Sequence, residues 1–313
     1  MVYVIILNWN NLSDTIGCLA SLYSTGETEF HAVVVDNGST DGSTDGIARW
    51  AEGKFRTGGS EASVASYYTK RYATDDGSSL VLIATGRNLG YAGGNNVGIK
   101  YAVESADCDY ICILNNDVIV DRLFLHNAVS CFVDPGIGIV SPLIAYWPAT
   151  DTIWYAGGRG FLGNVFHFHR GKSISETSLV PRTVNFATGC AFVARKEVFQ
   201  KVGYLNENFF LYGEDLEFSR RVLKYYSILF CPSARVFHKV SAVSGGETLN
   251  SNFLYYGRRN VKFLAHTIPQ KWLYFVADFT IVVIPALLRI MLSGKSKAPL
   301  LKALSRGIVG AWK

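Results

Sequence analysis

The chain has 313 residues, of which 49% are hydrophobic and 18% are charged. This composition supplies a well-buried core and excludes a disordered protein. The formal net charge is only +5, and the sequence after Asp278 contains basic but no acidic residues. A basic end favours an anionic surface such as a membrane. No nucleic-acid-binding motif accompanies it, which argues against a nucleic acid partner.

Strand and helix patterns alternate through the first half of the chain. Apolar runs rich in β-branched residues predict strands, and apolar residues at helical spacing predict helices between them. The predicted strands cover 2–9, 31–39, 79–88 and 110–118, and the predicted helices cover 12–23, 42–51 and 93–104. Continuous apolar strands separated by helices indicate an α/β protein with a largely parallel sheet covered on both faces.

A polar segment at 53–79 separates the second predicted helix from the third predicted strand. Its length predicts a variable surface loop, with a lid or an acceptor-contacting loop as the alternative.

After Gly136 the alternation of strands and helices weakens. His167 and His169 are predicted as alternating residues of an exposed strand rather than metal ligands, because no third ligand lies nearby in the sequence.

The six cysteines form no C-x-x-C pair, and most lie among apolar residues. They are predicted as reduced, buried thiols of a cytosolic protein.

The first residues, MVYVIILNWNN, lack a basic start and a small-residue cleavage site. They predict a strand rather than a secretory signal.

The stretch 272–292 is almost wholly apolar and long enough to cross a bilayer, but it contains Asp278, Pro285 and Arg289. Helical projection places Lys271, Asp278 and Arg289 in a narrow polar stripe, and Pro285 predicts a kink. An amphipathic helix in the membrane interface is favoured over a buried core helix or a transmembrane span. The residues that follow, APLLKALSRGIVGAWK, predict a second, basic amphipathic helix.

Two loops after predicted strands have the composition of a ligand site. VVVDNGSTDGS ends a strand at Asp36 and leads through a polar turn into a helix, whose N-terminal amides favour an anion or a nucleotide. Ordinary turn chemistry is the alternative.

TGRNLGYAGGNNVGI carries Gly90, Gly93 and Gly94, which allow the backbone to approach a ligand closely. It matches neither G-x-G-x-x-G nor G-x-x-x-x-G-K-[ST], so it predicts no dinucleotide or P-loop site.

Three further places in the sequence carry carboxylates or a histidine that could act as an acid, a base or a metal ligand. Glu214 and Asp215 open a predicted helix after two aromatic residues and a glycine, where either the helix dipole or a general base explains them. His238 follows a strand-like run and is either structural or a ligand. In YICILNNDVIV, the polar residues 115–117 interrupt an apolar strand, as a turn or a ligand site at a strand end would.

Taken together, these segments resemble a known family. VIILNWNNLSDTIGCLASL, VVVDNGSTDGS, RNLGYAGGNNVGI, ILNNDV, TGCAFVARKEVFQKVGYLNENFFLYGEDLEFSRRV and PSARVFHKVS occur in the order seen in glycosyltransferase family 2. The resemblance is closest to its rhamnosyltransferase-like branch and extends to about Ile268. It implies an α/β GT-A fold, Rossmann-like with a mostly parallel sheet, over 1–268, and membrane-associated amphipathic helices over 269–313. The sequence departs from the family in two places, since its metal motif has a single charged residue, Asp117, and Asn206 stands where the branch commonly has Asp.

The resemblance implies an inverting, metal-dependent glycosyltransferase. Asp117 and His238 would hold Mg²⁺ or Mn²⁺ together with the diphosphate oxygens of the donor. Asp215 would act as the general base, with Glu214 beside it. The residues implied to bind or orient the donor are Asn8, Asp36, Arg87, Asn88, Gly94, Asn95, Asn115 and Asn116.

The implied donor is dTDP-rhamnose or a UDP-sugar, and the implied acceptor is a hydroxyl of a surface glycan or of its lipid-linked precursor. The implied location is cytoplasmic, peripheral on the inner face of the cell membrane. A sugar-phosphate nucleotidyltransferase is an alternative, but NWNNLSD lacks the basic, Gly-rich loop that it would need after the first strand. A catalytically silent, membrane-associated scaffold that binds sugar nucleotides is another. The sparse metal motif favours it, and the intact GED and His238 argue against it.

Overall fold

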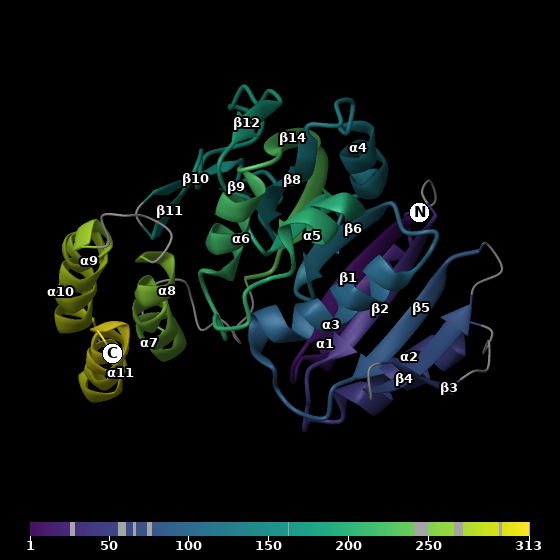
Figure 1. Ribbon diagram of the computed structural model, residues 1–313, viewed down its shortest axis with the longest axis horizontal. Coiled ribbons are helices and arrows are strands. Elements are labelled where there is room, and N and C mark those ends of the chain that lie inside the picture. Colours follow the sequence, from purple (N-terminus) through teal and green to yellow (C-terminus); the bar gives the residue numbers. More distant parts are fainter. Residues whose placement is uncertain are drawn as a thin grey trace.

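The computed structural model describes residues 1–25, 29–55, 61–64, 67–73, 77–161, 163–240, 250–265, 272–293 and 296–312. Within these residues a twelve-stranded mixed sheet forms the centre of the molecule. Helices cover both faces of the sheet, and the C-terminal helices form a separate group at one side (Figure 1).

Four parallel strands form the middle of the sheet, in the order β5 (Ser79–Ala84), β2 (Phe30–Asp36), β1 (Val2–Asn8) and β6 (Tyr110–Asn115). Most of their residues are buried, which explains the continuous apolar runs in the sequence. The parallel register pairs Asn8 with Asp36 and Leu7 with Asn115. Polar residues at the ends of three strands therefore meet at one edge of the sheet, where ligands bind in open α/β sheets.

Antiparallel pairing extends the sheet beyond β6. The further strands are β13 (Ala191–Arg195), β8 (Ile137–Tyr146), β14 (Ser227–His238) and β12 (Arg182–Val184), with β7 (Val118–Val120) on β14 and β9 (Ile153–Tyr155) on β8. β8 and β14 pair in parallel with each other, whereas β13 is antiparallel to both of its neighbours. β10 (Gly158–Phe161) and β11 (Asn164–His167) form a separate hairpin.

The helices divide between the two faces of the sheet. One face packs α1 (Leu12–Leu22), α2 (Ser43–Lys54) and α4 (Phe124–Ser130). The other packs α3 (Gly90–Glu104) and α5 (Lys196–Val202), and α6 (Glu214–Val222) contributes side chains to both cores. A Cβ atom on Gly98 would lie 2.5 Å from the Ile5 side chain, so glycine allows α3 to approach β1 closely.

The prediction of a loop over 53–79 is wrong in part. β3 (Glu61–Val64) and β4 (Tyr67–Ala73) form an antiparallel hairpin, and β4 pairs with β5. Thr69 and Tyr72 are buried, because β-branched and aromatic side chains suit a half-buried strand. The charged residues between them hid this pattern. Residues 56–60, 65–66 and 74–76 of the segment lie outside the described residues.

The C-terminal helices are α7 (Ser251–Arg259), α8 (Val261–Ala265), α9 (Trp272–Asp278), the π-helical turn η2 (Phe279–Val283), α10 (Ile284–Leu292) and α11 (Lys297–Trp312). The predicted polar stripe is wrong at Asp278, which pairs with Arg258 of α7 at 3.1 Å and is 13% exposed. A charge this deeply buried needs a partner, and helical projection alone does not reveal one. Arg289 is exposed, and Lys271 lies outside the described residues. The π-helical turn immediately precedes α10, in which Pro285 is the second residue.

α7 packs against α10 and α11. Leu254 of α7 lies in one apolar cluster with side chains of both later helices, Ala286, Ile290, Leu300 and Leu304. A Cβ atom on Gly307 would lie 2.7 Å from the carbonyl oxygens of Leu254 and Tyr255, so the backbones of α7 and α11 are in direct contact. The domain boundary between 268 and 269 remains a prediction.

The prediction of six reduced cysteines is wrong for two of them. Cys131, at the end of α4, and Cys231 of β14 form a disulfide. They meet because α4 packs against β14 across a sequence separation of 100 residues, which leaves no local spacing signal. The other four, Cys18, Cys108, Cys112 and Cys190, are free and buried.

Candidate active site

The carboxylate of Asp36 is fixed at the end of β2. It is 2% exposed. Its Oδ1 accepts a hydrogen bond from Asn8 Nδ2 at 2.7 Å. Its Oδ2 accepts from the Ser39 backbone N–H at 3.1 Å and from the Thr44 hydroxyl at 2.8 Å. The turn between β2 and α2 is therefore built around this carboxylate.

Asn8 connects Asp36 to the end of β6. Thr15 donates its hydroxyl to Asn8 Oδ1 at 2.8 Å, and Asn116 Nδ2 donates to the Thr15 oxygen at 2.9 Å. This chain of side chains fixes the ends of three strands relative to one another. No role was predicted for Thr15, although a polar residue on the buried face of a predicted helix was an available signal.

The loop after β5 packs on the loop after β2. Asn37 Nδ2 lies 3.1 Å from both Asn88 Oδ1 and the Gly90 carbonyl oxygen. A Cβ atom on Gly38, at φ +73°, would lie 2.5 Å from the Arg87 backbone, so only glycine allows this contact. The Arg87 side chain is exposed beside it.

Gly94 and Asn95 lie inside α3 rather than in an open loop. A Cβ atom on Gly94 would lie 2.4 Å from Leu7, so this glycine allows α3 to pack on β1. Asn95 is 1% exposed and donates to the Tyr91 carbonyl oxygen at 2.9 Å. Both residues have packing roles here, and their contact with a donor remains a prediction.

Asp117 and His238 meet where β7 pairs with the last residues of β14. Asp117 Oδ2 lies 3.2 Å from His238 Nε2, and the side chains are 9% and 10% exposed. The Lys239 N–H donates to the Asp117 carbonyl oxygen at 2.9 Å and closes the pairing. Burial works against a charged imidazole, but Cys190 and the Asp117 carboxylate outweigh it and raise the pKa of His238 well above its ordinary value.

The Asp117–His238 pair has the donor atoms for a divalent cation. Carboxylate oxygen and imidazole nitrogen are both ligands that Mn²⁺ accepts. Adjacent ligands of an octahedral ion, each at about 2.1 Å, lie about 3 Å apart. The spacing of 3.2 Å fits this arrangement. Across the described residues no group of three His, Cys, Asp or Glu side chains is placed to hold an ion.

Glu214 and Asp215 form the first turn of α6, directly after Gly213 at φ +96°. Glu214 is 5% exposed. Asp215 Oδ2 accepts from the Gly189 N–H at 3.0 Å, and its Oδ1 accepts from the Leu216 N–H at 2.8 Å. Burial raises the pKa of both carboxyl groups, and the charge of Asp215 raises the pKa of Glu214 further.

Tyr91 connects the carboxylate turn to the end of β6. Its hydroxyl oxygen lies 2.5 Å from the Gly189 carbonyl oxygen and 3.2 Å from Asn115 Oδ1. Burial, followed by the charges of Glu214 and Asp215, raises the pKa of Tyr91 well above its ordinary value, so the phenol is a neutral donor. Tyr91 and Gly189 lie in segments that carry the family resemblance, but neither was predicted to have a role.

His167 and His169 differ from each other in the structure. His167 ends β11, as predicted for a strand residue, and its ring centroid lies 4.8 Å from that of Trp154. His169 lies in the turn that follows, at φ +57°, so its assignment to a strand is wrong. In the part of the chain that the structure describes, neither histidine belongs to a metal-binding group.

Solved structures of other proteins share this fold. The mannosyltransferase PcManGT from Pyrobaculum calidifontis, in complex with GDP-Man and Mn²⁺, aligns with a TM-score of 0.58 and 15% identity over 99% of this chain and 85% of its own. S. aureus TarS in complex with UDP-GlcNAc aligns with a TM-score of 0.57 and 14% identity over 99% of this chain and 81% of its own. These likenesses show that the chain has the GT-A fold of glycosyltransferases, as predicted.

The sequence model described as glycosyl transferase family 2 matches residues 3–203, and the chain belongs to this family. It is 27% identical over 220 residues to the "Low-salt glycan biosynthesis hexosyltransferase Agl10" of Haloferax volcanii, over 70% of this chain and 60% of that protein. It is also 27% identical over 251 residues to the "N-acetylglucosaminyl-diphospho-decaprenol L-rhamnosyltransferase" of Mycobacterium tuberculosis, over 72% of each chain. The prediction of a family 2 glycosyltransferase is confirmed.

Proposed function

We propose that this protein is an inverting, metal-dependent glycosyltransferase that moves a sugar from a nucleoside-diphosphate donor to a hydroxyl group. The observation that carries the proposal is the connection between two pairs of side chains. The Asp117–His238 pair follows the end of β6, and the Glu214–Asp215 pair reaches the same strand end through Gly189 and Tyr91. Displacement of a diphosphate by a hydroxyl group requires a cation near the leaving group and a base near the attacking oxygen. Both are provided at this one strand end.

In the proposed reaction, Asp215 accepts the proton of the acceptor hydroxyl group. The acceptor oxygen bonds to the anomeric carbon, the bond from that carbon to the diphosphate oxygen breaks, and the nucleoside diphosphate leaves with the electron pair. Attack from the face opposite the leaving group inverts the anomeric centre. A divalent cation held by Asp117 and His238 would supply positive charge to the diphosphate.

The nucleotide side of the site is the edge formed by β2, β1 and β6. Asp36 and Asn8 are fixed there by hydrogen bonds, and the exposed Arg87 side chain lies on the neighbouring loop. Asn115 ends β6, and Asn116 follows it, one residue before Asp117. We propose that Asp36, Asn8 and Arg87 bind the nucleotide. We propose that Asn115 and Asn116 orient the donor.

The names of the relatives narrow the substrates that we propose. One relative is named as a hexosyltransferase of glycan biosynthesis, and the other as a rhamnosyltransferase of a diphospho-decaprenol-linked sugar. We therefore propose dTDP-rhamnose or a UDP-sugar as the donor, and a surface glycan or lipid-linked saccharide as the acceptor.

The test measures thermal unfolding and nucleoside-diphosphate release for the full chain with dTDP-rhamnose, UDP-glucose, UDP-GlcNAc and GDP-mannose, each with Mn²⁺ or EDTA. A productive donor present at a hundred times its Kd stabilises the folded state by about 2.7 kcal/mol. We expect one donor to stabilise the chain only with Mn²⁺ and to be slowly hydrolysed. Binding without release would favour the scaffold, and equal binding in EDTA would contradict the metal site.

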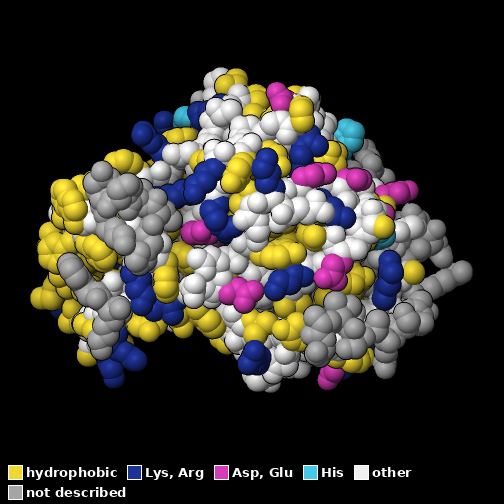
Figure 2. All heavy atoms as spheres, viewed as in Figure 1, with side chains coloured by type: hydrophobic (Ala, Val, Ile, Leu, Met, Phe, Trp, Pro, Cys, Tyr) yellow, Lys and Arg dark blue, Asp and Glu magenta, His cyan; other side chains and the backbone are white. Residues whose placement is uncertain are grey.

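We propose a peripheral location at the cytoplasmic face of the membrane, and the C-terminal helices support the membrane contact. In the described part of the chain one helix, Trp272–Leu292, is long and apolar enough to cross a bilayer, with a mean hydropathy of 2.1 and 22% of its apolar window buried. Figure 2 shows hydrophobic side chains gathered over these helices. The most exposed of them include Trp272, Phe279, Leu288, Met291 and Leu292.

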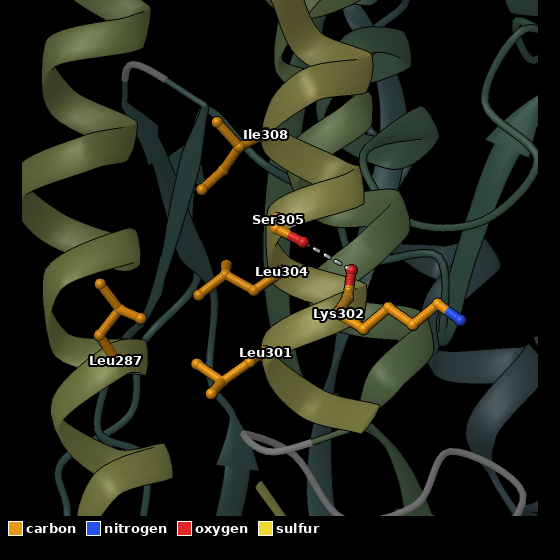
Figure 3. Close-up of a pocket in the computed structure, with 6 residues that line it drawn as sticks. All are labelled: Leu287, Leu301, Lys302, Leu304, Ser305 and Ile308. Atoms are coloured by element: carbon orange, nitrogen blue, oxygen red, sulfur yellow. Dashed lines mark hydrogen bonds between the residues drawn. The ribbon is translucent and has the colours of Figure 1, made fainter. Parts of the chain in front are cut away.

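An apolar groove lies between α10 and α11 (Figure 3). Leu287 faces Leu301, Leu304 and Ile308 across a space of about 360 Å³, and Lys302 points away from it. An apolar face flanked by basic residues, without acidic residues after Asp278, suits the surface of an anionic membrane. Because Asp278 is paired inside the protein, we propose that the helix lies in the interface rather than crossing the bilayer.

A further inference from the structure

Asn260, at the junction between α7 and α8, holds the turn that leads into α6. Its Nδ2 donates to the carbonyl oxygens of Leu211 at 2.9 Å and Tyr212 at 2.7 Å. Its Oδ1 accepts from Arg259 Nε at 2.9 Å. Asn260 is only 1% exposed, so its amide group is committed to contacts within the protein.

The turn that Asn260 holds has a backbone conformation that needs support. Tyr212 has φ +68° and Gly213 has φ +96°. The left-handed region is strained for a non-glycine residue, and it persists where the surroundings enforce it. The Tyr212 ring also packs against Phe253 of α7, with centroids 5.4 Å apart. α7 therefore supplies both the hydrogen bonds and the ring contact that keep this turn in place, directly before Glu214.

The same turn contacts the donor side of the site. The Phe210 carbonyl oxygen accepts from the Tyr91 N–H at 2.7 Å. The Tyr91 hydroxyl donates to Gly189, whose own N–H donates to Asp215. Movement of the turn would therefore displace Asp215 relative to the strand end that carries the cation site.

We propose that Asn260 is a positioning residue for the reaction, acting through Leu211 and Tyr212 to set the direction of the Asp215 carboxylate. The proposal rests on the proposed function, because it takes Asp215 as the general base. Asn260 touches no reacting atom. Its effect is geometric, and a displacement of about 1 Å in a catalytic group lowers a rate by about a hundredfold.

The first measurement compares Asn260→Ala with the parent chain. The readouts are kcat for nucleoside-diphosphate release, from the panel donor with the fastest Mn²⁺-dependent release, and the Kd of that donor. We expect kcat to fall about tenfold to a hundredfold with an unchanged Kd. Asn252→Ala, which removes an exposed asparagine from the same helix, is the matched control and should keep the parent kcat. An unchanged kcat for Asn260→Ala, or a loss confined to donor binding, would overturn the proposal.

The second measurement is a double-mutant cycle with Asp215→Asn. If Asn260 acts through Asp215, the two losses are not additive, and adding Asn260→Ala to Asp215→Asn lowers kcat little further. Equal losses in both backgrounds would overturn the proposal. Normal turnover in Asp215→Asn alone would instead refute the proposed base.

Should the alanine variant unfold, Asn260→Asp keeps the side-chain volume without the two N–H donors. Unfolding of both variants would assign Asn260 to stability alone and overturn the positioning role.

Discussion

Asp117 Oδ2 and His238 Nε2 lie 3.2 Å apart, although 121 residues separate them in the sequence. They meet because β7, which directly follows Asp117, pairs with the last three residues of β14. One partner therefore comes from the parallel half of the sheet and the other from the antiparallel half. A cation held by both would bind only to the completed sheet.

This relationship predicts a metal-specific loss of donor binding. Asp117→Ala and His238→Ala should each weaken Mn²⁺-dependent donor binding at least about tenfold, because each removes one of two protein ligands. Binding measured in EDTA should change little. The control is His126→Ala, which removes an exposed histidine of α4. Unchanged Mn²⁺ dependence in both site variants would rule the cation site out.

The second prediction separates the two carboxylates of the α6 turn. Asp215→Asn preserves size but removes the base, so turnover should fall by about 10²–10⁴-fold with donor affinity retained. Glu214→Gln should lower turnover less, because the proposed reaction places the proton on Asp215 and not on Glu214. Steady-state release assays with donor titrations measure both effects. Loss of donor binding in Asp215→Asn would mean that Asp215 holds the site together instead of acting as the base.

The third prediction concerns stability and pH. Burial, with the charge of Asp215, raises the pKa of Glu214 in the folded state. Protonated Glu214 therefore contributes stability that is fully present below the unfolded-state pKa, and this contribution is lost as pH rises through the higher folded-state pKa. Gln cannot ionise, so Glu214→Gln should unfold at a higher temperature than the parent at pH 8, with the difference vanishing near pH 4.

Thermal unfolding of both proteins across this pH range measures the effect. Glu217→Gln is the matched control, because Glu217 lies in the same helix and pairs with Arg221 through contacts of 2.7 and 2.9 Å. Its substitution should lower the unfolding temperature at neutral pH. An equal difference between Glu214→Gln and the parent at pH 4 and pH 8 would argue against ionisation of Glu214 as the cause.

The fourth prediction tests the apolar face of the C-terminal helices. Leu288 and Met291 are each 59% exposed. Replacing both by Glu should weaken sedimentation with phosphatidylglycerol-containing vesicles by about tenfold or more, because burial of each side chain is worth about 1.5–3 kcal/mol. Val133→Glu, at a position 85% exposed after α4, is the control for added charge. Undiminished vesicle binding by the double variant would place the membrane contact elsewhere.

The parallel half of the fold was predictable from its sequence pattern. β1, β2, β5 and β6 are buried on both faces and read as unbroken apolar runs. The antiparallel half was not, because β8 is equally buried but nothing in its sequence indicates which strand it pairs with. The β4 strand escaped detection because Lys70 and Arg71 interrupt its apolar side chains.

A site residue was predictable from the sequence where it lies in a recognisable segment, and not where it acts through a contact made by tertiary packing. Asp36, Asp117 and Asp215 lie in segments whose composition or family resemblance marks them directly. Asn260 acts on the backbone of Tyr212 across 48 residues, and the Tyr91 hydroxyl acts on the Gly189 backbone across 98. Such contacts follow from tertiary packing and leave no local pattern in the sequence.

The position of Asn260 also bears on the order in which the site is completed during synthesis. Chains fold from the N-terminus as they emerge from the ribosome. The strand ends on the nucleotide side emerge first, whereas α7 gains its packing partner only when α11, with Gly307 against its backbone, has emerged. Under the proposed function, a nascent chain has the residues assigned to the sugar nucleotide before it has the support that orients its base. Orientation of the Asp215 carboxylate would therefore be completed only after α11 has been synthesised, later than the parallel half of the sheet.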